Sequence, residues 1–431
     1  MFALILFAVF LVIVLAGVPL MFGLLSTTIG AIFFTDQRWM IKIPNILLTF
    51  LSGIEPYMLI AVPLFMFAGE ILSKGGAGKR IVTFLQSLLE FLPGGLGIVT
   101  VSACLLFGGI SGSALADTAA IGSIVIPLML QKGYTKGFTA ALIAVAGTLA
   151  LLMPISIPFL VYAFIANVSM RELSMAGVVP AIFSAVALSL ICAREGIKTG
   201  CDKGGKPASF KEIWTAFKGA AFALLLPIII IGGIWSGTFT PTEAAAIATV
   251  VGLVISIWVY KDMKWKDVPG LLLAALKTSA TVMLVIGATG CLSWLITVNQ
   301  VAQQMTAVIS AVATEPWQFL IMVNIALFIL GIFIEPLPAM LLSAPLFIPL
   351  ALFFKIDMVH FGVIFTGNLA IALYTPPVGG TLFIAAKIAK AGIGEISKRI
   401  MPLMAMMLLV IIVVTYVPAS TSILRNILMA K

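Results

Sequence analysis

Two carboxyl groups stand alone in long apolar stretches of the sequence. Asp117 is the only charged residue in positions 91–131, and Glu335 is the only one in positions 316–354. An ionisable side chain inside an apolar segment is costly unless it is paired or binds a ligand, so it marks a candidate functional site. We therefore take Asp117 and Glu335 as candidate ligand-binding groups.

Glycine, serine and proline interrupt the apolar segments near both carboxyl groups. The run Gly108–Ser113 precedes Asp117, and Met153–Ser156 interrupts the next segment. A helix that breaks in an apolar medium leaves carbonyl and N–H groups without partners, which costs free energy unless something binds them. Sodium is a hard cation that unwound carbonyls and hydroxyls can hold, while half-helix N-termini attract anions. The alternative is close helix packing through Gly112.

A second pair of interruptions follows later in the chain, at positions 335–338 and 375–380. Gly331, Glu335 and the residues Thr375–Val378 are candidates for a second cation cage there. The sequence thus predicts two cages, each built from two broken segments.

The composition excludes a soluble globular protein. Of 431 residues, 62% are hydrophobic and 10% are charged, against about 25% charged in soluble domains. The chain has room for about a dozen membrane spans. The net charge of +9 resides mostly in short loops, as in cytoplasmic loops of membrane proteins, and not in a nucleic-acid-binding block. We expect an all-α polytopic membrane protein in a lipid bilayer, without a nucleic-acid partner.

One offset relates the two halves of the chain. The polar stretch 193–219 divides the sequence, and a shift of 222 residues aligns nine identical pairs across this divide. The most informative matches place Gly109 on Gly331 and Pro154 on Pro376, because backbone geometry restricts these residue types. Paired, Gly- and Pro-interrupted segments in two halves are typical of secondary transporters. Identities alone leave open whether the repeats are inverted.

The run Gly109–Gly122 (GISGSALADTAAIG) resembles the signature of the large membrane subunit of TRAP transporters, the tripartite ATP-independent periplasmic uptake systems. Further resemblance lies in four segments spread over the chain: Pro63–Glu70, the break at Pro154, Thr240–Ala245 and Thr375–Gly379. Together these segments cover essentially the whole sequence.

The resemblance implies an elevator-type fold with inverted repeats, two helical hairpins and broken helices. It also implies sodium-driven import of a small organic acid, such as a C4-dicarboxylate or sialic acid, across a bacterial inner membrane. The implied partners are a small four-helix membrane subunit and a periplasmic substrate-binding protein. We expect the following parts: scaffold segments at 1–72, a first transport repeat at 81–193, a basic cytoplasmic loop at 194–218, central scaffold helices at 219–260 and a second transport repeat at 268–420.

The resemblance also suggests site residues. The first sodium site would use Ser111, Ser113, Ala150, Met153 and Ile155, largely through carbonyls. The second would use Gly331, Glu335, Thr375 and Val378. Ile155 replaces the family's usual second proline, Ala150 its usual glycine, and Glu335 its shorter aspartate. We expect the substrate between Ser113, Asp117 and Ser156.

Three alternative functions are compatible with parts of the sequence. A stand-alone sodium-coupled dicarboxylate symporter is the nearest one, and a passive channel suits broken hairpins less well. An intramembrane enzyme is disfavoured because Asp117 lacks a partner aspartate, and because Ser111 and Ser113 lack a placed base. We therefore expect no catalytic residues and no organic cofactor.

Overall fold

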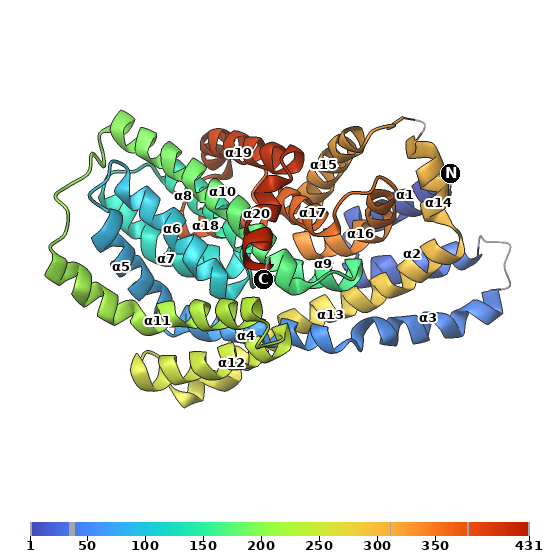
Figure 1. Cartoon of the computed structure of the whole chain (residues 1–431), viewed down its shortest axis with the longest axis horizontal. Helices are drawn as coiled ribbons and strands as arrows, with labels where there is room; N and C mark the ends of the chain where they lie inside the picture. Colours follow the sequence, from blue (N-terminus) through green and yellow to red (C-terminus); the bar gives the residue numbers. More distant parts are fainter. Residues whose placement is uncertain (1, 34–38, 311, 377–378, 430–431) are drawn as a thin grey trace.

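The computed structural model describes residues 2–33, 39–310, 312–376 and 379–429, and helices are the only regular secondary structure in them. Ten helical segments in this part of the chain are long and apolar enough to cross a membrane, judged by length and composition. These features confirm the prediction of an all-α polytopic protein (Figure 1).

The elements, with η marking short 3-10 or π-helical turns, have these bounds: α1 (Phe2–Leu15), α2 (Leu20–Phe33), α3 (Trp39–Ile54), η1 (Tyr57–Ile60), α4 (Ala61–Lys74), α5 (Ala77–Leu89), α6 (Gly95–Ser111), α7 (Ala114–Gln131), α8 (Lys136–Gly147), η2 (Thr148–Leu152), α9 (Ile157–Ala166), α10 (Met170–Thr199), α11 (Phe210–Ser236), α12 (Pro241–Val254), η3 (Ile255–Val259), η4 (Trp265–Asp267), α13 (Val268–Val298), α14 (Val301–Ser310), α15 (Pro316–Phe333), α16 (Pro336–Phe353), α17 (Met358–Ala372), α18 (Gly380–Ala389), α19 (Ile393–Tyr416) and α20 (Ala419–Met429).

Two hairpins form where the sequence predicts interruptions. In the first, α6 ends at Ser111 and is followed by Gly112, whose φ of +61° suits glycine. Ser113 then caps α7 by accepting a hydrogen bond from Ala116 N at 3.4 Å. In the second, α15 ends before extended Ile334, and α16 begins after Glu335. The two arms of each hairpin pack against each other.

Each hairpin is followed by a broken helix. The first runs from α8 through η2, breaks at Met153–Ser156 and continues as α9, whose first turn contains Pro158. The second runs from α17 to Ala372 and resumes at Gly380 as α18. Proline at the start of a helix fits because its missing N–H would have no helical partner there.

The helices recur in the same order in both halves. Corresponding starts lie 221 to 223 residues apart for α6 and α15, α7 and α16, α8 and α17, α9 and α18, and α10 and α19. The start of α12 follows that of α2 by 221 residues. The repeat of elements therefore extends beyond the segments in which sequence identities reveal it.

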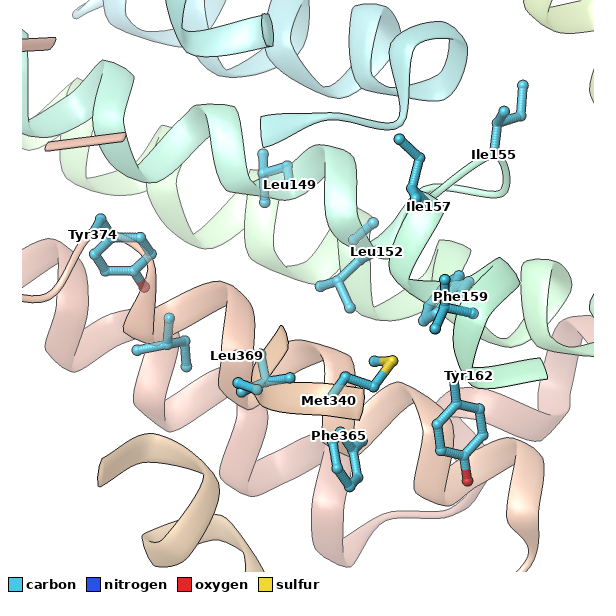
Figure 2. Packing of buried hydrophobic residues seen from close by; sticks show 14 of the residues in the cluster. Leu149, Leu152, Ile155, Ile157, Phe159, Tyr162, Met340, Phe365, Leu369 and Tyr374 are labelled. Carbon is cyan, nitrogen blue, oxygen red and sulfur yellow. The ribbon is translucent and has the colours of Figure 1, made fainter. Parts of the chain in front are cut away.

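The two broken helices run in opposite directions. The Tyr162 hydroxyl at the end of α9 donates to the Met358 carbonyl at the start of α17 at 2.8 Å, and the Tyr162 and Phe365 rings lie 6.0 Å apart. Figure 2 shows Leu149, Leu152 and Tyr162 progressing opposite to Phe365, Leu369 and Tyr374. Moreover, α9 packs on α16 while α18 packs on α7. The repeats are thus inverted and interlocked.

The predicted basic loop at 194–218 differs from the structure at both ends. Helix α10 continues to Thr199, and α11 already begins at Phe210, so only residues 200–209 are without helix. Ser209 and Glu212 form a capping box: the Ser209 N–H donates to the Glu212 carboxylate at 2.7 Å, and the Glu212 N–H donates to the Ser209 hydroxyl at 3.3 Å. The predicted loop is too long because its outer cationic residues lie on the exposed ends of two long helices, and a charged residue indicates exposure and not the absence of helix.

Helix α13 lies among the N-terminal helices. It packs on α2, α3 and α4 on one side and reaches α16 of the second hairpin on another. A corresponding contact occurs in the first half: α4 packs on α12, just as α13 packs on α2, the repeat partner of α12. These contacts surround the hairpin tips with helices from both halves.

Candidate functional site

The tip of the first hairpin is pressed against the first break. Ile157 N donates to the Gly112 carbonyl at 3.4 Å, and a Cβ on Gly112 would collide with the Ile155 carbonyl oxygen. A side chain at position 112 is therefore excluded by both the positive φ and the close approach. The contact brings the predicted ligands Ser111 and Ile155 to the same place.

Asp117 is fully buried directly behind this tip. The Ser111 hydroxyl donates to Asp117 Oδ1, while Asp117 Oδ2 has no hydrogen-bond partner in the described part of the protein. An ideal Cβ on Gly108 would lie 3.0 Å from Asp117 Oδ2 and 2.6 Å from Ala150 Cα. Asp117 Oδ2 thus lies beside the close contact between Gly108 of α6 and Ala150 of η2. A buried carboxylate with a free oxygen requires a cation or a proton.

The remaining predicted ligands of the first site lie on the break itself. The Ala150 carbonyl accepts from Met153 N at 3.3 Å, and the Met153 carbonyl accepts from Ser156 N at 3.0 Å. Each carbonyl retains a second lone pair that can bind a cation. Ser156 is buried and caps α9 by accepting from Phe159 N at 3.3 Å. Its hydroxyl therefore already has a structural role at the start of α9.

The second predicted set is arranged similarly but less completely. Gly331 packs on Ala372, the repeat partner of Ala150, and an ideal Cβ on Gly331 would lie 3.3 Å from Leu369 Cδ2. The Thr375 hydroxyl donates to the Ile371 carbonyl at 2.8 Å. Val378 lies outside the described residues.

A cavity of about 120 Å³ lies between the two hairpin tips. Ser113 and Glu335 both line it, whereas Asp117 and Ser156 lie behind its wall. Both hairpins, both broken helices, α4 and α13 contribute its lining: Met66, Gly112, Ser113, Ala114, Leu115, Leu151, Ile157, Pro158, Thr278, Val282, Glu335, Pro336, Leu337 and Leu373. The two halves therefore share one cavity.

A larger cavity of about 560 Å³ adjoins the first between α2, α13 and the second hairpin. The two cavities share Thr278, Val282, Glu335 and Leu337. Lys277 also lines the larger cavity. The sequence reasoning missed Lys277, although it is the only charged residue in positions 268–314 and the lone-charge criterion would have identified it.

The sequence matches the family model described as the tripartite ATP-independent periplasmic transporter, DctM component, over residues 7–420. It is 37% identical to the C4-dicarboxylate TRAP transporter large permease protein DctM of Rhodobacter capsulatus, over 99% of this chain and 100% of that protein. It is 36% identical to the isethionate TRAP transporter permease protein DctMQ of Oleidesulfovibrio alaskensis, over 96% of this chain and 64% of that protein. It is 33% identical to the sialic acid TRAP transporter permease protein SiaT of Haemophilus influenzae, over 97% of this chain and 68% of that protein.

Proposed function

The chain belongs to the DctM-component family of tripartite ATP-independent periplasmic (TRAP) transporters, which are transporter permeases and not enzymes, and from this premise we propose that it imports a small organic acid together with sodium. The observation that carries the proposal is the cavity that both hairpin tips line, with Ser113 on one tip and Glu335 on the other. Broken helices beside such a cavity supply unpaired backbone groups for a substrate and its coupling ion.

Sodium is the proposed co-transported cation. Ser111, Asp117 Oδ2 and the carbonyls at Ala150, Met153 and Ile155 offer hard oxygen donors around the first tip. The burial of an otherwise uncompensated carboxylate favours a cation there. Gly331, Glu335 and Thr375 form the proposed second sodium site.

The proposed substrate is a small organic anion. Relatives of this chain are named as transporters of C4-dicarboxylate, isethionate, 2,3-diketo-L-gulonate and sialic acid. These compounds share an acidic group that is ionised at neutral pH. In the proposed site, the Ser113 hydroxyl contacts the substrate directly, while Asp117 and Ser156 support the two backbone segments that surround it.

The proposed partners are a small four-helix membrane subunit and a periplasmic substrate-binding protein, in a bacterial inner membrane. One relative is named DctMQ, and this chain spans only 64% of its length. The remaining part of that relative supports the existence of a second subunit, which would be a separate chain here. The family is a component of tripartite periplasmic transporters, which supports two further parts, one of them in the periplasm. Many large apolar side chains on α11, α12 and α13 are exposed and are available to lipid or to this subunit.

The proposed mechanism is an elevator movement of a core past a scaffold. Because α9 packs on α16 and α18 on α7, the two hairpins and broken helices form one interlocked unit. We place α13 with the scaffold segments 1–72 and 219–260, because it packs on α2, α3 and α4. The moving unit then comprises repeat 1 at 81–193 and the part of repeat 2 after α13.

Reconstitution tests this function. The protein, its small subunit and candidate binding proteins are placed in liposomes, and uptake of labelled succinate, isethionate or N-acetylneuraminate is followed with and without an inward sodium gradient. We expect uptake that requires both sodium and a binding protein. Uptake without any binding protein would favour a stand-alone symporter, and uptake indifferent to sodium would contradict the proposed coupling.

A matched pair of variants tests the site. Ser113→Ala removes the hydroxyl that faces the cavity, and we expect it to weaken uptake without preventing membrane insertion. Ser123→Ala changes an exposed serine on the same helix, whose hydroxyl donates to the Ala120 carbonyl at 2.8 Å, and should retain wild-type uptake. Equal uptake by both variants would contradict the role of Ser113.

A further inference from the structure

Helix α13 (Val268–Val298), which is long and apolar enough to cross a membrane, carries one charged side chain within its length. Lys277 lies nine residues after the first residue of α13, about 14 Å along the helix axis at a rise of about 1.5 Å per residue. It is the only charged residue of this 31-residue helix. A cation at such a position is expensive in lipid and is normally directed to a water-filled path or to a partner.

Lys277 has no carboxylate partner in the described part of the protein. The ion pairs found there, with nitrogen to oxygen distances up to 4.0 Å, do not include it. Glu335 lines the same cavity of about 560 Å³, but it too is outside these pairs. The lining of this cavity therefore includes an exposed lysine that is not paired with a neighbouring acid.

The polar face around Lys277 continues toward the hairpin tips. Thr278 and Thr281 line the same cavity, and Thr278 also lines the cavity of about 120 Å³ that contains Ser113. The Thr281 hydroxyl donates to the Lys277 carbonyl at 3.1 Å. All three side chains are exposed. Polar side chains on one face of a membrane helix, beside a cavity, favour contact with water over contact with lipid.

We propose that Lys277 binds the acidic group of the substrate in the larger cavity and delivers the anion past Thr278 to the site between the tips. This inference rests on the proposed function, because it requires an organic anion as substrate. Since α13 packs on α2, α3 and α4, the ammonium group belongs to the proposed scaffold, while Ser113 and Glu335 belong to the moving hairpins. Lys277 therefore selects for negative charge at entry, and Glu335 repels an anion that approaches without this compensation.

The alternative is that the Lys277 ammonium extends along its aliphatic stem to the membrane surface, where it has no part in transport. The two roles predict different effects of removing the charge. A lysine at the surface is dispensable for substrate affinity, whereas a substrate-binding lysine is replaceable only by another cation.

The test uses the full complex in liposomes and whichever of labelled succinate, isethionate and N-acetylneuraminate the wild-type protein takes up. The variants are Lys277→Gln and Lys277→Arg, with Lys266→Gln as the control. Lys266 is exposed on η4, outside both cavities. We expect Lys277→Gln to raise the half-saturating substrate concentration at least tenfold, Lys277→Arg to remain near wild type, and Lys266→Gln to be unchanged.

A second measurement separates substrate binding from a folding defect. The half-saturating sodium concentration should stay at the wild-type value in Lys277→Gln, because the proposed sodium ligands lie on other helices. Unchanged substrate dependence in Lys277→Gln, or equal impairment by glutamine and arginine, would overturn the inference. If the wild-type complex takes up none of the three anions, the proposed function itself fails.

Discussion

The Ser111 hydroxyl donates a hydrogen bond to one carboxylate oxygen of Asp117, and the other oxygen has no partner in the described part of the protein. Ser111 is the last residue of α6, and Asp117 lies in the first turn of α7, so this bond closes the hairpin tip. Both side chains are buried. The tip thus contains a carboxylate that is positioned by one hydroxyl and remains open to a cation.

Asp117→Asn tests whether this carboxylate attracts sodium. Asparagine keeps the shape and the bond from Ser111 but removes the charge, so we expect the half-saturating sodium concentration for uptake to rise at least tenfold. Uptake by proteoliposomes at varied external sodium measures this change. Glu90→Gln removes a carboxylate whose partner is Lys132, 2.8 Å away at the helix ends, and should keep the wild-type sodium dependence. An unaltered sodium requirement in Asp117→Asn would exclude Asp117 from the sodium site.

The sequence predicted the hairpins and breaks well, because their determinants are local. Gly112 has a positive φ, and Pro154 lies in the break between η2 and α9, so the residue types reveal the backbone conformation at both places. The direction of the repeats was not predictable from identities. It depends on contacts such as Tyr162 with Met358, which are 196 residues apart in the sequence.

The site was predicted less completely than the fold. Ser113 and Glu335 meet at one cavity, but Asp117 and Ser156 lie behind its wall. Lys277 was not predicted because it lies on α13, an unbroken helix, whereas the predicted site residues lie where helices break. Its role depends on which helices pack around α13, and that is a property of tertiary structure.

Gly108→Ala tests the close contact between the first hairpin and the broken helix. The new methyl group would lie 2.6 Å from Ala150 Cα, so α6 and η2 must separate. Overpacking of this kind costs about 1–3 kcal/mol, and we expect a lower melting temperature of the purified protein in detergent. Gly232→Ala on α11 adds a methyl group with no atom within 4 Å and should be neutral or slightly stabilising. Equal melting temperatures for the two variants would show that α6 accommodates the methyl group.

The ion pairs of Arg425 predict a pH-dependent anchor for α20. Arg425 lies 2.9 Å from Asp357 and 3.6 Å from Glu172. Burial raises the pKa of Asp357, but the hydrogen bond from Arg425 and the N–H groups of His360 and Val359 lower it on balance below its usual value of 3.8. A lowered carboxyl pKa stabilises the folded protein above the usual pKa, and this stabilisation is lost as the pH falls through the folded-state pKa.

Arg425→Gln should therefore lower the melting temperature at pH 7, and the difference from wild type should shrink as the pH falls from the usual carboxyl pKa of 3.8 through the lower folded-state pKa of Asp357. Thermal unfolding in detergent between pH 7 and pH 3 measures this difference. Arg194→Gln removes an exposed arginine outside the ion pairs of the described residues and should have little effect throughout. A difference that stays constant with pH would show that Asp357 is not the group that Arg425 stabilises.

Tyr162→Phe tests the contact that joins the two inverted halves. The Tyr162 hydroxyl donates to the Met358 carbonyl at 2.8 Å, and the Tyr162 side chain is fully buried. Loss of this hydrogen bond in a buried setting is expected to cost about 1 kcal/mol and to lower the melting temperature, while the ring keeps its contact with Phe365. Tyr416→Phe is the matched control, because the exposed Tyr416 hydroxyl donates to the Trp317 carbonyl over a longer distance of 3.4 Å. If both variants unfold at the same temperature, the Tyr162 hydroxyl does not stabilise the junction between α9 and α17.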